Sequence, residues 1–198
     1  FGFIFYEMNK PIIISTTGHM LVDALNENPI NNEKIQKVML NALMRYQTSN
    51  PFRKNANDNV PLPLLLRVIK LLKDDPEENA AGVFRSELSL IICWPDNNAD
   101  SLYRKIKEVR RQYSFTYGDE VIYGICLDLL GAGEDKKKRF KIDQITGEAV
   151  DEFIRKMRIT GIVSLRGNGR FLDFNNFEID TINYILKNYS EYPHFTTK

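Results

Sequence analysis

The sequence predicts a mainly helical α+β fold in which short β-hairpins accompany amphipathic helices. Apolar residues recur at helical spacing in several stretches, most regularly over 33–47. Two pairs of short β-branched and aromatic runs, each separated by turn residues, predict hairpins within 1–14 and 162–174. The composition, 43% hydrophobic and 27% charged, is typical of a globular protein with a packed core.

The first part of the chain is predicted to form a hairpin and two helices. Strands at 1–6 and 11–14 flank a turn, and the polar residues that follow can cap a helix over 15–26. The apolar stripe of 33–47 predicts the second helix. The Asn-rich stretch 48–60 is predicted to be a loop between two subdomains.

Three helices are expected in the middle of the chain, over 61–75, 87–94 and 99–113. Proline is tolerated in the first turn of 61–75, and Ser86 is expected to cap 87–94. The acidic segment 74–78 is expected to be a solvated loop that faces away from the basic residues of the chain.

The remaining segments are predicted to be helices, one basic loop and a hairpin. Helices are expected over 119–130 and 147–158, with the loop 131–141 between them. Strands 162–165 and 170–174 are joined across Arg166-Gly-Asn-Gly, a turn sequence that tolerates positive φ. Asn175 or Asn176 can then cap a final helix that ends near Tyr189.

The two hairpins belong to a repeated pattern. Each has a glycine (Gly2 or Gly161), a strand, a tight turn, a second strand, a polar cap and a helix. This order is that of the closing half of a winged helix, although two unrelated hairpins in an α+β domain would give the same pattern. We therefore expect the end of a first winged-helix subdomain over 1–55, a second winged-helix-like subdomain over 56–190, and a tail or linker over 191–198.

The sequence lacks the residue patterns that several classes of functional site require. The two histidines have no metal-ligand spacing with other residues, and no glycine-rich loop precedes Lys-Ser or Lys-Thr as a nucleotide site requires. Cys93 and Cys126 lie in apolar runs and are expected to be buried thiols. The apolar run 88–94 is far too short to cross a membrane. No catalytic residue, metal site or small-molecule substrate is predicted.

The sequence argues against a magnesium-dependent nuclease centre of the PD-(D/E)xK kind within this chain. Pro95-Asp96 and Asp135-Lys136 match its letters. The first pair is predicted in a turn between helices and the second in a charged loop, so their carboxylates would not converge on one metal ion.

The strongest functional pattern is a helix–turn–helix candidate over 86–113, in which a short helix and a turn precede a basic amphipathic helix. Arginine, lysine and amide side chains on such a helix can reach phosphates and base edges of DNA. Lys107 and Arg110 add to its positive charge, although a merely solvated helical face would show the same pattern. The candidate DNA contacts lie on this helix, in the basic loop and at the wing turn: Asn97, Asn98, Ser101, Arg104, Lys105, Arg111, Lys136, Lys137, Lys138, Arg139, Arg166, Asn168 and Arg170.

Five stretches in succession resemble the DNA-recognition region of AlwI-type restriction endonucleases, which include related type IIS nicking enzymes. They are FGFIF…IISTTGHML, IQKVMLNALMRYQTSNPF, PLPLLLRVIKLLK, SELSLIIC and RKMRITGIVSLRGNGRFLDFNN. The resemblance implies winged-helix subdomains that recognise double-stranded DNA. It also implies a separate PD-(D/E)xK cleavage domain that requires Mg²⁺, lies beyond this chain and offers a route to dimerisation. Such an enzyme would act in the cytoplasm of a prokaryote.

On this resemblance we expect a non-catalytic recognition fragment, with the phosphates held by the loop and wing cations and the bases read by the polar face of 99–113. A winged-helix transcription regulator or protein-interaction module without a nuclease partner is the alternative. A self-contained nuclease is a third, which predicts Mg²⁺-dependent cleavage by this chain alone.

Overall fold

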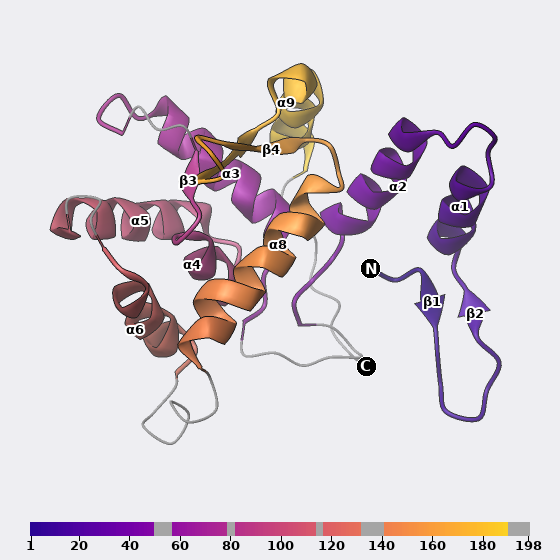
Figure 1. Cartoon of the computed structure of the whole chain (residues 1–198), viewed down its shortest axis with the longest axis horizontal. Coiled ribbons are helices and arrows are strands. Elements are labelled where there is room, and N and C mark those ends of the chain that lie inside the picture. Colours follow the sequence, from indigo (N-terminus) through magenta and orange to yellow (C-terminus); the bar gives the residue numbers. More distant parts are fainter. Residues whose placement is uncertain (50–56, 79–81, 114–116, 132–140, 190–198) are drawn as a thin grey trace.

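The computed structural model describes residues 1–49, 57–78, 82–113, 117–131 and 141–189. The fold is α+β and mainly helical, as predicted, with a two-stranded and a three-stranded antiparallel sheet. Figure 1 shows the N-terminal hairpin and the first two helices beside a larger helical body. In the described ranges, every helix is too short or too polar to span a membrane.

The N-terminal part contains the predicted hairpin and two helices: β1 (Ile4–Phe5), β2 (Ile13–Ile14), α1 (Thr16–Leu25) and α2 (Asn32–Met44). The second helix ends three residues earlier than the stripe predicts. α1 packs against α2, and α2 against the first helix of the larger body. The hairpin leaves most of its apolar side chains exposed, including those of Ile4, Phe5, Ile12 and Ile13.

The larger body is built around one apolar helix. Its first four helices are α3 (Pro61–Asp74), α4 (Leu88–Cys93), α5 (Ala99–Tyr113) and α6 (Asp119–Leu129). α3 buries most of its leucines and packs against α4, α5 and the last helix of the chain. Pro61 begins α3, where the N–H that proline lacks would have no partner within the helix.

The predicted helix over 147–158 begins earlier than expected, because a π-helical segment (Asp143–Glu148) leads directly into α8 (Ala149–Arg158). The second hairpin follows as β4 (Val163–Arg166) and β5 (Phe171–Phe174), close to the predicted strands. Asn175 caps a 3₁₀ turn before α9 (Ile179–Asn188).

A third strand, β3 (Val83–Phe84), joins this hairpin and was not predicted. It pairs with β5, so the strand order is β3-β5-β4. Ser86, expected to cap the following helix, instead lies in the turn between β3 and α4. Glu87 precedes α4, and its carboxylate accepts the N–H of Phe84 at 2.9 Å. Two residues are too few to show a strand periodicity, so the sequence pattern could not reveal β3.

The two hairpins share the same local structure at the residues where they begin and end. Gly2 and Gly161 both have positive φ, at 72° and 78°. The side chains of Ser15 and Asn175 each donate a hydrogen bond to the carbonyl of the corresponding glycine and cap the helical turn that follows. The strand pairings Ile4 with Ile14 and Val163 with Phe174 occupy equivalent positions. The repeated sequence pattern therefore corresponds to a repeated local structure.

Candidate nucleic-acid interface

The asparagines predicted to contact DNA at the start of α5 hold the helix in place. Asn97 Oδ1 accepts the N–H of Val60 at 2.7 Å and so fixes the start of α3. Asn98 Oδ1 accepts the N–H of Ser101 at 3.0 Å and caps α5. Each side chain keeps its amide NH₂ as a donor for another partner.

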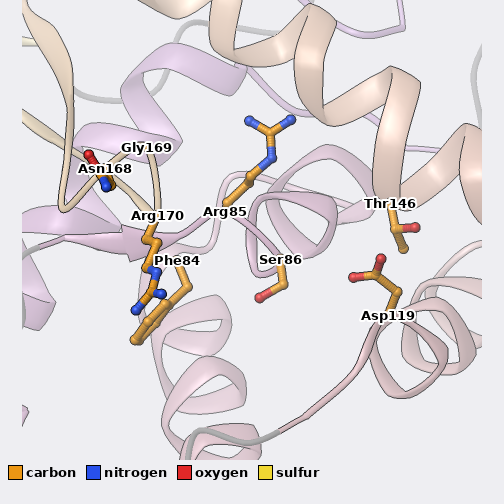
Figure 2. Close-up of a pocket in the computed structure, with 8 residues that line it drawn as sticks. All are labelled: Phe84, Arg85, Ser86, Asp119, Thr146, Asn168, Gly169 and Arg170. Carbon is orange, nitrogen blue, oxygen red and sulfur yellow. The ribbon is translucent and has the colours of Figure 1, made fainter.

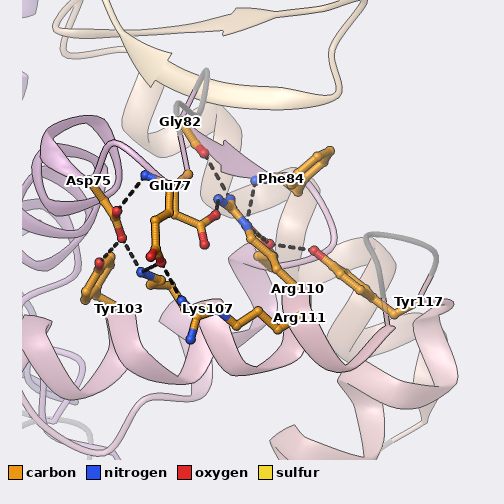
Figure 3. Close-up of polar contacts among 11 residues, drawn as sticks. Asp75, Glu77, Gly82, Phe84, Tyr103, Lys107, Arg110, Arg111 and Tyr117 are labelled. Carbon is orange, nitrogen blue, oxygen red and sulfur yellow. Dashed lines mark hydrogen bonds and ion pairs between the residues drawn. The ribbon is translucent and has the colours of Figure 1, made fainter.

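The basic face of α5 contacts the acidic segment 74–78. We expected this segment to be a solvated loop that faces away from the basic residues, and that prediction is wrong. Lys107 pairs with Asp75 and with Glu77, the latter at 3.1 Å, and Arg111 pairs with Glu77 at 2.5 Å (Figure 3). Hydrogen bonds from Lys107 and from Tyr103 hold the pKa of Asp75 well below its ordinary value. These contacts neutralise much of the positive charge that the sequence pattern assigns to this helix.

Arg110 is buried, so it does not belong to an exposed basic face. Its guanidinium donates to both oxygens of Glu87 at 2.7 Å and to Glu78 at 2.9 Å (Figure 3). Burial lowers the pKa of Arg110, but the hydrogen bonds to Glu87 and Glu78 outweigh it and raise the pKa overall. Tyr117 donates to Glu87 at 2.5 Å, and burial together with the charge of Glu87 raises the pKa of this phenol. This cluster joins α5, α4, the acidic segment and the start of α6.

Two other predicted contacts on α5 remain exposed or half-buried. Lys105 pairs with Glu108 at 3.1 Å, an exposed pair that contributes little to stability. Arg104 is exposed and forms no ion pair with any residue that the structure describes. Within the described ranges, Arg104 is therefore the only cation on α5 that can bind an external anion without losing an ion-pair partner.

The predicted wing contacts lie at the turn between β4 and β5. Gly167, Asn168 and Gly169 all have positive φ, at 58°, 58° and 82°, which is the backbone that the Gly-Asn-Gly sequence favours. The side chains of Asn168 and Arg170 are exposed. Arg166 lies further back, 3.4 Å from the buried carboxylate of Asp173, and donates to the carbonyl of Phe174 at 3.3 Å.

The turn of the hairpin β4–β5, the predicted wing, borders a groove of about 400 Å³, whose lining includes several polar and cationic side chains. Figure 2 shows its residues: Phe84, Arg85, Ser86, Asp119, Thr146, Asn168, Gly169 and Arg170. The backbone N–H of Arg85 donates to the carbonyl of Arg170 at 2.7 Å, and the guanidinium of Arg85 pairs with Asp151 on α8. Arg85 thus connects the wing to α8 across the groove.

The structure brings only part of the predicted site together. Asn168 and Arg170 line the groove, whereas Lys107 and Arg111 on α5 face the acidic segment. Lys136, Lys137, Lys138 and Arg139 lie outside the described residues.

The predicted contacts did not include four cations near the groove or on α8: Arg85, Arg155, Lys156 and Arg158. The spacing of Arg155 and Arg158, opposite the apolar stripe of their helix, was the available signal.

The resemblance implies a Mg²⁺-dependent enzyme, and a Mg²⁺ centre requires several carboxylate ligands close together. Within the described ranges, no three His, Cys, Asp or Glu side chains gather in a way that could hold a metal ion. These residues do not fit a Mg²⁺ centre. Cys93 and Cys126 are free, buried thiols, and the hydrogen-bond interaction of the Cys126 thiol with Cys93, together with burial, raises the pKa of Cys126.

Comparison with known proteins gives one family. No curated protein matches the sequence significantly. The family described as AlwI restriction endonuclease matches residues 1–197, essentially the whole chain. Its members are restriction enzymes, which makes DNA the partner. The extent of this match shows that the chain belongs to the AlwI restriction endonuclease family.

Proposed function

We propose that this chain is the DNA-recognition part of a type IIS-like restriction endonuclease and binds a specific sequence in double-stranded DNA. The family match over residues 1–197 carries the proposal. The cleavage centre, with its Mg²⁺, is proposed to lie outside these residues, as the sequence resemblance implies. Dimerisation through that cleavage domain belongs to the same proposal.

The arrangement of the second hairpin supports this proposal. The chain order α3, β3, α4, further helices, β4 and β5, with the sheet order β3-β5-β4, is the order expected of a winged helix with helices inserted before its wing, and it supports the proposal. The first hairpin repeats the glycine, register and cap of the second. We therefore propose two winged-helix units, with the closing part of one over 1–55 and a second over 56–190, and a tail or linker over 191–198.

The proposed contacts come from the predicted residues that remain available. Three of them have exposed side chains: Arg104, Asn168 and Arg170. Neither of the two arginines forms an ion pair with a residue that the structure describes. Ser101, Asn97 and Asn98 retain polar groups beside Arg104. Three further members of the proposed set must exchange their present ion-pair partner for DNA: Lys105, Arg111 and Arg166. The other members lie outside the described residues: Lys136, Lys137, Lys138 and Arg139.

Equilibrium binding to duplex DNA tests the proposal. The wild-type chain is incubated with a pool of random-sequence duplexes, and bound duplexes are selected and sequenced over several rounds. We expect one short asymmetric sequence to be enriched. Incubation of the enriched duplex with the chain and Mg²⁺ is expected to leave it uncut. Enrichment of no sequence would contradict DNA recognition, and Mg²⁺-dependent cutting would contradict the placement of the cleavage centre.

The basic loop allows a second test, of its role at phosphates. Lys137→Ala is expected to weaken binding to enriched and scrambled duplexes alike and to reduce the salt slope by about one unit. The control is Lys37→Ala on α2, where the lysine is exposed and pairs with Glu33 at 2.6 Å. A loss confined to the enriched duplex would contradict a phosphate role for Lys137.

A further inference from the structure

The packing of the helices identifies a different helix for base recognition than the sequence suggests. In a helix–turn–helix, the first helix packs across the second, which enters the major groove. α4 packs mainly against α6 and α8, whereas α5 packs mainly against α3. α8 also leads through the turn at Gly161 directly into the hairpin β4–β5. Thus α8 occupies the position between α4 and the wing that the sequence pattern assigned to α5.

Arg85 ties this helix to the tip of the wing. Its backbone N–H donates to the carbonyl of Arg170, and its guanidinium pairs with Asp151 on α8. In Figure 2, Arg85 lies between the wing loop that carries Asn168 and the ribbon of α8. The face of α8 that carries Asp151 is therefore beside the groove and on the same side as the wing tip.

Two arginines continue this face of α8. Asp151, Arg155 and Arg158 are spaced by four and three residues, so they form one stripe along the helix. The opposite face is buried through Val150, Phe153, Ile154 and Met157. Arg155 and Arg158 are both exposed, and Arg155 Nε donates to the carbonyl of Asp151 at 3.4 Å. Neither guanidinium forms an ion pair with a residue in the described part of the chain.

The acidic side chains of α8 do not cancel these charges. Asp151 is paired with Arg85, and Glu152 is paired with Lys156 at 2.5 Å. On α5, by contrast, most cations are paired with carboxylates. In the described ranges, Arg104 is the only cation of that helix without a carboxylate partner. A guanidinium that must leave an internal ion pair binds DNA at the cost of that pair.

We infer that α8 is the helix that enters the major groove, with Arg155 and Arg158 as its base-reading side chains. Asn168 and Arg170 at the wing tip contact the adjacent backbone. This inference rests on the proposed recognition of double-stranded DNA. A guanidinium can donate to the O6 and N7 of guanine together, whereas a phosphate contact carries no sequence information. We therefore assign to Arg104 a contribution of charge only.

The test compares arginines on the two helices in the full 198-residue chain. The duplex enriched by the wild-type chain and a scrambled duplex are titrated with Arg155→Ala, Arg158→Ala and the matched control Arg104→Ala. We expect each α8 variant to lower the preference for the enriched duplex by about tenfold or more. Arg104→Ala is expected to weaken binding to both duplexes equally and leave the preference unchanged. Arg155→Lys, which keeps the charge, is expected to retain the affinity for the scrambled duplex.

The outcomes separate this inference from the function on which it rests. If the wild-type chain enriches a sequence but both α8 alanine variants keep the full preference, α8 is not the reading helix, and DNA recognition stands. Loss of preference in Arg104→Ala alone would place the reading surface on α5. If the wild-type chain enriches nothing, the proposed function fails with the inference. Circular dichroism of each variant verifies the fold, which changes at these exposed positions should preserve.

Discussion

At the scale of single residues, Arg110 shows how burial changes the role of a charged side chain. Its side chain is 1% exposed, and that of its partner Glu87 is 0% exposed. Both charges have lost their hydration. It is replaced by the two hydrogen bonds between them, by the one that Arg110 donates to Glu78 and by the one that Tyr117 donates to Glu87. The group joins segments that are separated by 23 to 32 residues in sequence.

Removal of this guanidinium should therefore be costly. Arg110→Ala leaves the Glu87 carboxylate buried without its main partner, and we expect a loss of about 3–5 kcal/mol in the free energy of unfolding. The matched control, Arg104→Ala on the same helix, should change it by no more than about 0.5 kcal/mol. Urea unfolding at pH 7 measures both. Similar losses for the two variants would contradict the structural role of Arg110.

Asp75 should make the stability of the protein depend on pH in the acid range. Its pKa is lowered in the folded state by Lys107 and Tyr103, so the unfolded chain binds the proton more tightly. The stabilisation is fully present above the ordinary aspartate pKa of about 4 and is lost as the pH falls through the folded-state value.

We expect Asp75→Asn to lower the melting temperature at pH 7 by a few degrees and to differ less from the wild type at pH 3. Asp128→Asn, which removes an exposed carboxylate at the end of α6, provides the comparison. Thermal unfolding at the two pH values measures the effect. A deficit for Asp75→Asn that is as large at pH 3 as at pH 7 would contradict it.

At the scale of elements, the hairpin β4–β5 has a turn that is set by local backbone preference. Three successive residues, Gly167 to Gly169, adopt positive φ. The turn end of the hairpin is held by β3 through the ring contact between Phe84 and Phe171, with centroids 4.3 Å apart. The turn geometry follows from the Gly-Asn-Gly sequence. The attachment of the hairpin to β3 depends on a strand that is distant in sequence.

The turn should tolerate side chains poorly at its first glycine. At Gly167, a Cβ would meet the Phe171 ring at 2.9 Å, and φ is +58°. We expect Gly167→Ala to lower the free energy of unfolding by about 1–2 kcal/mol, from the left-handed backbone alone. Gly124→Ala, at an exposed helical position with open space around it, should raise it by about 0.5–1 kcal/mol. Chemical unfolding of both variants tests this pair, and an equal response at the two sites would contradict the argument.

At the scale of the whole molecule, the apolar core is concentrated in the larger body. α3 contributes most of its side chains to that core, whereas the hairpin β1–β2 exposes nearly all of its own. Ile13 and Tyr6 are 64% and 67% exposed. The N-terminal unit therefore has far less buried apolar surface to stabilise it.

We expect this difference to appear in hydrogen exchange. Backbone amides of β1, β2 and α1 should exchange through local opening, faster than those of α3, which should exchange only through global unfolding. Hydrogen exchange followed by mass spectrometry on the free chain measures both sets. Equal protection of the two regions would show that the N-terminal unit is stabilised by contacts other than those described here.

The sequence alone determined those features that depend on residues close together along the chain. The helical periodicity of 99–113 predicted α5 with its bounds, and the Gly-Asn-Gly sequence predicted the turn between β4 and β5. The repeated order of glycine, strands and cap predicted the shared local structure of the two hairpins. The succession of motifs also indicated the family. In each of these cases, the decisive contacts join near neighbours, so the pattern itself contains the information.

The tertiary structure decided which charges are available for binding. The sequence gives the number of cations on α5 and cannot show that the segment 74–78, about 30 residues earlier, folds back to neutralise them. For the same reason it could not show β3, or that α4 packs against α8. An ion pair forms between whichever side chains packing brings together, and packing is a property of the whole core. That is why the surface proposed to meet DNA moves from α5 to α8 once the fold is known.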